Sequence, residues 1–266
     1  MKKLGLFLIV SLFSVCLTSC LNSDSTFEDD AIGVMTYGSK GNSIVIKTWG
    51  GDILGGPSIN ALYMNGDMTT DGCYYFRYLF DRDLPENHLD VVAANGFTTV
   101  SILGYQEIDK YYMSYSLTDT STVMPEEVPI VDGCYNIRAY INKNLFLTHT
   151  ANQPTDLSLY WDMSYDANTM MPTIVDAERL YDIYIRARKT NSSSNSKVNL
   201  SYINAYYVSN YLENAAIREK ELNPSATELI MRFNYVASID ENDKITWGST
   251  IQRVSIAAIL ASMESE

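Results

Sequence analysis

Cys20 is the residue of this chain whose neighbours most clearly predict a chemical reaction. It follows Leu17-Thr18-Ser19, so one hydrophobic residue and two small residues precede the thiol. This spacing is typical of a lipobox, in which the thiol is diacylated in the membrane and a signal peptidase then cuts before the cysteine. Two lysines and an almost wholly apolar run at residues 4–17 complete such a leader, and this run is too short to span a bilayer. The sequence therefore predicts that residues 1–19 are a signal peptide and that Cys20 carries the lipid.

A lipidated Cys20 also predicts where the protein is held. Two or more acyl chains attach a protein durably to a membrane, so no transmembrane helix is needed. No later apolar stretch approaches the roughly 18 residues that a membrane-spanning helix requires. Leu21 stands where the usual inner-membrane retention signal has an aspartate. We therefore expect an outer-membrane lipoprotein of the cell envelope, and the sequence leaves its face of that membrane open.

The two histidines do not form a recognisable catalytic or metal site. His88 lies in a polar stretch that is expected to be a loop, and His149 ends an expected strand. Neither has a metal-ligand spacing such as His-Glu-x-x-His, so we predict surface histidines without a chemical role. The glycines at 50–51 and 55–56 lack the Lys-Ser/Thr that holds a phosphate, and they are expected to permit turns.

Paired carboxylates are the next candidates, because glycosidases place two of them across a cleft. The pairs Asp81/Asp83 and Glu126/Glu127 and the acidic cluster at residues 240–243 all lie in expected turns or linkers. Acidic residues are common there because they are solvated and hydrogen-bond the turn backbone. The sequence therefore predicts no catalytic residue, no metal ligand and no cofactor, and it favours a protein that is not an enzyme.

Two cysteines, Cys73 and Cys134, remain in the mature chain besides Cys20. Each follows Asp-Gly and opens an expected strand. An oxidising envelope permits a disulfide between them. Each thiol could equally lie in a separate core as a small apolar group, so both alternatives stay open.

Composition limits the partners. The formal net charge of −13 should repel nucleic acid and anionic lipid headgroups, so we expect no nucleic-acid partner. The chain has 20 tyrosines against 8 phenylalanines and 3 tryptophans, and tyrosine suits both half-buried strands and contact surfaces for glycans or proteins. The candidate binding aromatics, which are simply core residues if they are buried, are Tyr74, Phe76, Tyr78, Trp161 and Trp247.

Hydrophobic alternation and turn signals define a first module. Residues 20–32 are polar and acidic after the cysteine, and they are expected to form a flexible tether. Residues 33–117 contain five short expected strands separated by glycine-rich turns. Such a series indicates a small barrel or sandwich.

A second module follows a predicted linker. Residues 118–132 are polar and acidic and contain Pro125 and Pro129, which suit an extended linker. Residues 133–266 then resume the pattern of strands and turns. One segment, at 205–222, has apolar residues at helical spacing and is predicted as the one substantial helix.

With the lipobox, two strand-rich modules and the linker, the chain resembles the NigD-like lipoproteins of anaerobic Gram-negative bacteria. The segments that carry the resemblance are residues 42–54, 71–80, 98–108, 137–148 and 228–251. The resemblance implies a mainly β fold, with an N-terminal OB-like β-barrel followed by a C-terminal β-sandwich that here carries one helix. The family's aspartate run after the lipidated cysteine is diluted here to Asn22-Ser23-Asp24-Ser25. The family has a loose tie to bacteriocin gene clusters, and the resemblance carries over no catalytic residue to this chain.

Three functions compete at this point. The leading one is a non-catalytic envelope lipoprotein that is held to the membrane by its lipid and binds a protein or glycan partner. The second is a carbohydrate-binding lipoprotein of a glycan-uptake system, and the third is an envelope hydrolase. An exposed aromatic row would favour a glycan, a broad apolar patch a protein, and a cleft lined by two acids an enzyme.

Overall fold

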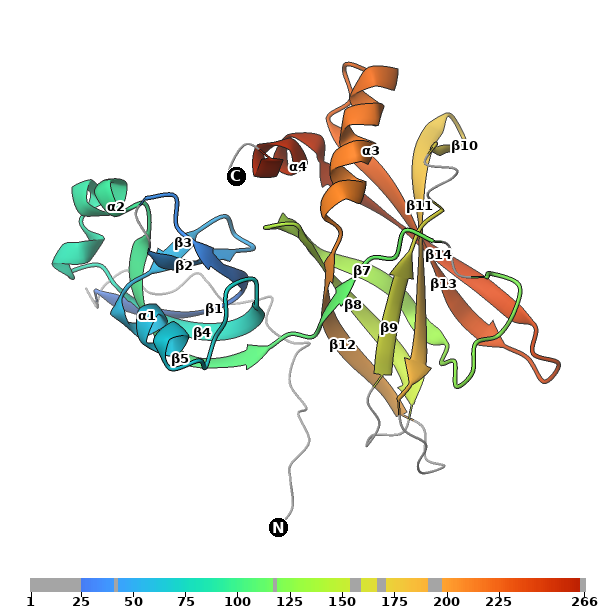
Figure 1. Cartoon of the computed structure of the whole chain (residues 1–266), viewed down its shortest axis with the longest axis horizontal. Coiled ribbons are helices and arrows are strands. Elements are labelled where there is room, and N and C mark those ends of the chain that lie inside the picture. Colours follow the sequence, from blue (N-terminus) through green and yellow to red (C-terminus); the bar gives the residue numbers. More distant parts are fainter. Residues whose placement is uncertain are drawn as a thin grey trace, which may run out of the picture.

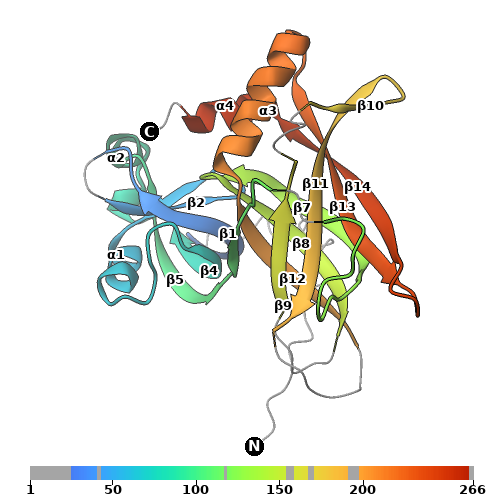
Figure 2. The same ribbon diagram turned by 45° about the vertical axis from the view of Figure 1, so that its right-hand side comes forward.

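The computed structural model describes residues 25–40, 43–116, 119–153, 159–166, 171–190 and 198–263. These residues form two modules that lie side by side, a barrel coloured blue to green and a larger module coloured green to red (Figures 1 and 2). The expected signal peptide and Cys20 lie outside the described residues.

Five strands close the first module into a barrel. They are β1 (Thr26–Tyr37), β2 (Ile44–Thr48), β3 (Ile53–Gly55), β4 (Cys73–Asp81) and β5 (Thr98–Glu107). Their order is β1-β2-β3-β5-β4, and β4 returns to pair with β1. β3 and β5 run parallel, and the other neighbouring pairs are antiparallel. This is the strand order of an OB-like barrel, so the predicted fold of the first module is confirmed.

Short helices fill the connections of the barrel. α1 (Pro57–Met64) joins β3 to β4, and η1 (Pro85–Asn87) and α2 (Leu89–Asn95) join β4 to β5. The glycines before Pro57 are predicted from the sequence to permit a turn, whereas the structure starts a helix there. Pro57 suits the first helical turn, and Gly56 precedes it with a φ of 113° that favours glycine.

β1 begins earlier than the sequence predicts. Its first residues are exposed and belong to the stretch expected as a flexible tether. Nevertheless Thr26 pairs with Asp81, and Ile32 pairs with Tyr75, in the ladder between β1 and β4. Backbone hydrogen bonds hold this part of β1, and hydrophobic patterning does not detect such bonds. Residues from Thr26 onward therefore belong to the barrel.

Two sheets form the second module. The four-stranded sheet has the order β6-β12-β8-β7 and consists of β6 (Lys110–Tyr112), β12 (Val198–Tyr207), β8 (Asn144–Gln153) and β7 (Ile130–Ile141). The five-stranded sheet has the order β10-β11-β13-β14, with β9 paired to β11, and consists of β10 (Thr173–Val175), β11 (Glu178–Lys189), β13 (Glu228–Ile239), β14 (Ile245–Ser255) and β9 (Leu159–Ser164).

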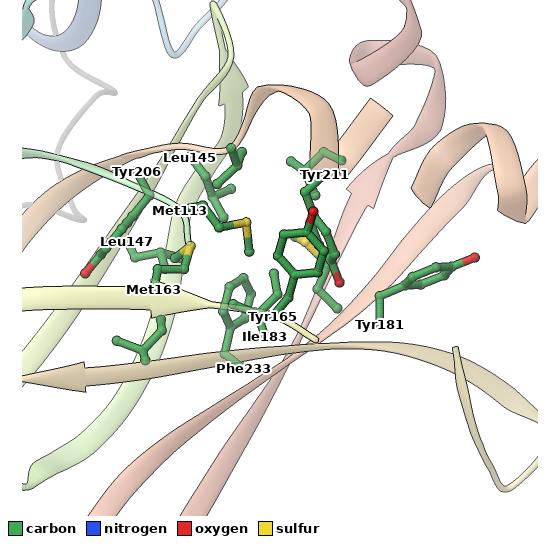
Figure 3. Packing of buried hydrophobic residues seen from close by; sticks show 14 of the residues in the cluster. Met113, Leu145, Leu147, Met163, Tyr165, Tyr181, Ile183, Tyr206, Tyr211 and Phe233 are labelled. Atoms are coloured by element: carbon green, nitrogen blue, oxygen red, sulfur yellow. The ribbon is translucent and has the colours of Figure 1, made fainter. Parts of the chain in front are cut away.

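Side chains from both sheets meet in one core (Figure 3). Leu145 and Leu147 come from the four-stranded sheet, Met163 and Ile183 from the five-stranded sheet, and all four are fully buried. Tyr211 joins this core from a helix. Burial of apolar side chains between two sheets is the driving force for a β-sandwich. The predicted mainly β fold is confirmed.

The second module has two helices among its described residues rather than the one predicted. They are α3 (Ser209–Leu222) and α4 (Ile256–Met263). α3 begins later than predicted, because residues 205–207 complete β12. The helical spacing of apolar residues starts only after this strand, so the prediction placed the boundary too early.

The segment predicted as a linker packs against the second module, and residues 119–128 are called the strap below. Arg186 of β11 has a side chain that is 1% exposed, and its Nε donates to Oε1 of Glu127 at 2.5 Å. The same guanidinium donates to the backbone carbonyls of Asp119 and Thr122. The prediction of a linker between the two modules is wrong, because this acidic segment follows β6 within the second module and is held there by a buried arginine of β11.

Two further contacts fix the strap. The backbone N–H of Val128 donates to the carbonyl of Ala187 at 2.8 Å, beside β11. Trp247 of β14 donates from Nε1 to the carbonyl of Thr120 at 3.1 Å. The strap therefore contacts two strands of the five-stranded sheet.

An apolar interface joins the two modules. Ile32, Val34 and Cys73 of the barrel form one buried cluster with residues of the second module, namely Ile141, Phe146 and Ala205, and with Ile108 of the connection. β6 belongs to the second module, because it pairs in parallel with β12. The module boundary therefore lies earlier in the sequence than the predicted residues 117–118. It falls in the connection between β5 and β6.

Candidate functional site

The predicted binding aromatics of β4 lie inside the barrel. Tyr74, Phe76 and Tyr78 are 2%, 0% and 7% exposed, and all three belong to the barrel core. Alternate residues of a strand share one face, and in a closed barrel this face points inward. The prediction that these side chains contact a ligand is wrong, and they are core residues.

The two predicted tryptophans are also packed. Trp161 is 1% exposed and stacks on His149 with the ring centroids 4.5 Å apart. Trp247 is half-buried, with its indole N–H bonded to the strap. Neither is an exposed platform, so this part of the prediction is wrong as well.

His149 is a buried residue, whereas the sequence predicts a surface position. It is 0% exposed, and the hydroxyl of Tyr206 lies 2.8 Å from its Nε2. Burial lowers the pKa of His149 from 6.5 to about 3, so the ring is neutral at physiological pH. His88 is exposed, as predicted.

Cys73 is a free, buried thiol in the structure. It lies in the apolar interface between the modules, and burial raises its pKa to about 12. The sequence leaves open whether Cys73 forms a disulfide with Cys134 or packs as a small apolar group. In the structure Cys73 is a free thiol that packs in an apolar core. The side chain of Cys134 lies outside the described residues, although its backbone pairs with His149 in the ladder between β7 and β8.

A polar cleft of about 1090 Å³ opens between the modules, and it is called the inter-module cleft below. On the barrel side its lining residues are Thr36, Tyr37, Gly38, Ser39, Val45, Lys47, Ile53 and Asp71. On the opposite side they are Lys110, Tyr112, Asn142, Lys143, Asn144 and Tyr207. β2 and β3 contribute to the barrel wall, and this is the face that OB-folds use for oligonucleotides and oligosaccharides.

Lys110 is held in place at the junction of the two walls. Its Nζ donates to the backbone carbonyl of Asp71 at 2.8 Å. The same ammonium group lies 5.6 Å from the ring centroid of Tyr112 and 5.8 Å from that of Tyr207. Both distances are within the range of a cation–π contact. Lys110 therefore presents a charge that is already ordered before any ligand binds.

A tight hairpin turn places Lys143 on the edge of the cleft. Asn142 and Lys143 have φ values of 45° and 64°, as the two central residues of a type I′ turn require. Asn144 is 1% exposed and donates from Nδ2 to the carbonyl of Asn142 at 2.7 Å, so it braces the turn. A lysine is uncommon at positive φ, and the two-residue turn between β7 and β8 holds Lys143 in this conformation.

Three tyrosines face the cleft. Tyr37 and Tyr112 are 58% and 68% exposed, and the ring of Tyr112 packs against Tyr207 with the centroids 5.6 Å apart. Tyr37 is the last residue of β1 and pairs with Ile44, so its backbone belongs to the barrel. A hydrogen bond to Tyr37 raises the pKa of Tyr63, which lies on α1. Tyr37 and Tyr112 are therefore exposed aromatic residues flanked by polar groups, whereas Tyr207 is half-buried.

None of the cleft residues is among the aromatics selected from the sequence. The cleft forms only because β6 pairs with β12 and the modules dock, and neither contact is visible in a local pattern. Two local signals do exist. Lys110 and Tyr112 stand close together near the module boundary, and Asn142-Lys143 between two strands is a hairpin signal.

The acidic pairs have structural roles. Asp81 Oδ1 accepts from the N–H of Asp83 at 2.9 Å, and Asp240 Oδ1 accepts from two backbone N–H groups in its turn. Glu127 is bound by Arg186. Asp71 is the one carboxylate among the described residues that line the cleft. A pair of facing acids, which a glycosidase would need, is therefore not part of that lining.

The described part of the chain lacks two further features. No helix there is long and apolar enough to cross a membrane. No group of three or more His, Cys, Asp or Glu side chains there has the arrangement of a metal site.

The fold defines a two-module β protein with an OB-like barrel docked on a sandwich, and solved structures share it. An uncharacterised protein from Parabacteroides merdae has a TM-score of 0.70 at 21% identity, and the match covers 85% of this chain and 98% of that one. A protein from Parabacteroides distasonis whose description relates it to a toxin has a TM-score of 0.52 at 9% identity, covering 89% and 99%. No protein-family model and no curated relative matches the chain. The likeness shows that both modules occur together in other proteins of similar length.

Proposed function

We propose that this protein is a non-catalytic, lipid-anchored module of the cell envelope that binds a glycan in the inter-module cleft. The observation that carries the proposal is the cleft itself, with about 1090 Å³ of space and exposed tyrosines on both walls. Sugar rings offer apolar faces that stack on tyrosine, and their hydroxyls bond to nearby polar groups. The cleft is therefore better suited to a saccharide than to a broad apolar protein surface.

The position of the cleft on the barrel supports the same function. OB-folds bind oligosaccharides on the face of strands 2 and 3, and Lys47 and Ile53 lie on this face here. A glycan-uptake system is one setting in which a tethered, non-catalytic glycan-binding module would act.

We further propose that the chain is a NigD-like lipoprotein of the outer membrane. The lipobox at Leu17-Thr18-Ser19-Cys20 and the order of barrel and sandwich support this assignment. Similar folds in proteins of Parabacteroides are compatible with the bacterial group in which this family occurs.

Loss of one exposed ring should weaken glycan binding. In the Tyr112→Ala variant of residues 21–266 we expect the affinity for a glycan selected on a glycan array to fall about tenfold, which is ~1.4 kcal/mol. Tyr112→Phe should keep most of the affinity, because the ring face remains. Isothermal titration calorimetry with the selected glycan measures both variants.

Tyr160→Ala is the matched control, because Tyr160 is 43% exposed on β9 and does not line the cleft. This variant should bind like the wild type. Equal losses in Tyr112→Ala and Tyr160→Ala would place the binding site elsewhere, and an array without a single bound glycan would refute the proposed function.

The anchor is tested separately in cells. Replacing Cys20 with alanine removes the thiol that is acylated, so we expect loss of labelling by a fatty-acid analogue and an uncleaved leader. Gel fluorescence and mass spectrometry of the N-terminus measure the two effects. Labelling that survives the substitution would contradict the anchor.

A further inference from the structure

The inter-module cleft has the opposite charge balance from the rest of the chain. Lys47, Lys110 and Lys143 line it, and Asp71 is the one acidic side chain among its described lining residues. The whole chain has a formal net charge of −13. A positive cleft on an acidic protein attracts anionic groups locally, because a nearby charge acts more strongly than distant charges that salt screens.

The three lysines reach the cleft from different parts of the fold. Lys47 lies on β2, Lys110 on β6 and Lys143 in the turn between β7 and β8. Lys110 is fixed by the Asp71 carbonyl and two tyrosine rings. Docking of the modules therefore gathers these charges, and a ligand that meets Lys110 finds a side chain that is already held in place.

We infer that the cleft recognises an acidic glycan, meaning an oligosaccharide that carries carboxylate or sulfate groups along its length. This inference rests on the proposed function and adds the charge of the ligand. Lysine ammonium groups act as compact point charges for such anions, while Tyr37 and Tyr112 offer faces for the sugar rings. A long polyanion such as nucleic acid would extend beyond the cleft and be repelled by this net-acidic chain, whereas a short acidic oligosaccharide would stay within the cleft.

A pair of ligands that differ only in charge tests the inference. Oligomers of galacturonic acid carry one carboxylate on each sugar, and galactose oligomers of the same length carry none. A sulfated oligosaccharide of equal length forms a third arm and separates carboxylate from sulfate. Titration calorimetry of residues 21–266 at low salt should show an acidic oligomer binding at least tenfold more tightly than the neutral one, and 0.5 M sodium chloride should remove most of this difference.

Charge-removing variants then locate the effect. Lys47→Gln and Lys110→Gln should each weaken binding of the acidic oligomer about fivefold, as expected for a charge pair near the surface, and leave neutral oligomers unaffected. Lys244→Gln is the matched control, because Lys244 is exposed at the hairpin between β13 and β14 and outside the cleft lining. Lys110 also joins the two modules through its bond to Asp71, so Lys110→Gln could fail to fold. In that case Lys47→Gln alone tests whether the charge effect arises in the cleft.

The outcomes separate this inference from the proposed function. Equal affinities for charged and neutral oligomers, with Tyr112→Ala still weakening both, would overturn the acidic ligand and leave glycan binding standing. Losses that are as large for Lys244→Gln as for Lys47→Gln would overturn the assignment of the charge effect to the cleft. Binding of no glycan by the wild type would overturn both proposals.

Discussion

The Arg186→Ala variant is expected to lose about 3–5 kcal/mol of free energy of unfolding. The side chains of Arg186 and Glu127 are 1% and 0% exposed, and their ion pair has an N–O distance of 2.5 Å. Without the guanidinium, the Glu127 carboxylate is buried without a counter-charge, and two strap carbonyls lose their donor. Urea denaturation followed by circular dichroism should give a correspondingly lower midpoint.

Two further variants make this expectation specific. Arg253→Ala removes an arginine whose ion pair with Glu178 is 44% exposed on each side, so its cost should stay within about 1 kcal/mol. The double variant Arg186→Met/Glu127→Leu should recover part of the loss, because apolar residues often replace a buried ion pair at little cost. A loss below about 1 kcal/mol in Arg186→Ala would mean that this ion pair does not anchor the strap.

The wild type is expected to lose stability through His149 as the pH falls below about 6.5. The pKa of His149 is about 3 in the folded protein because of burial, whereas an exposed histidine titrates near 6.5. Between these values the unfolded chain binds a proton that the folded chain excludes, so acid favours unfolding. This one site should contribute a slope that approaches about 1.4 kcal/mol per pH unit, or about 2 kcal/mol between pH 6.5 and 4.5.

Comparison with His149→Gln isolates this slope from the titration of the carboxylates. The variant should have a lower free energy of unfolding than the wild type at pH 7.5. This difference in free energy should be smaller by about 3 kcal/mol at pH 4.5. His88→Gln, at an exposed position, should show no pH-dependent difference from the wild type. A gap between the wild type and His149→Gln that stays constant with pH would show that His149 protonates in the folded state as readily as in the unfolded chain.

Much of the fold could be predicted from local patterns. Alternating residues along β4 and the turn at Asn142-Lys143 identify strands and a hairpin directly. The patterns failed where backbone pairing or a single buried charge decides the structure. β1 starts at an exposed Thr26, and the acidic strap is held by Arg186, which stands far away in the sequence.

The site was harder to predict than the fold. Aromatic residues on a strand look alike whether they point into a barrel or out of it, so the sequence predicts Phe76 as a binding residue although it is 0% exposed. Tyr37, Tyr112 and Lys47 come together only through docking of the modules. A sequence reveals which side chains could bind a ligand, but contacts between distant segments decide which of them meet.

The early start of β1 has a consequence for a lipid-anchored protein. Even a fully extended chain from Cys20 to Thr26 reaches only roughly 20 Å, because each residue spans at most about 3.6 Å. An acylated Cys20 would therefore keep the barrel against the bilayer. A partner in the same membrane would share a thin layer with the cleft, and its effective concentration there would far exceed that in free solution. Weak affinity measured for the isolated chain would then still allow high occupancy on the cell.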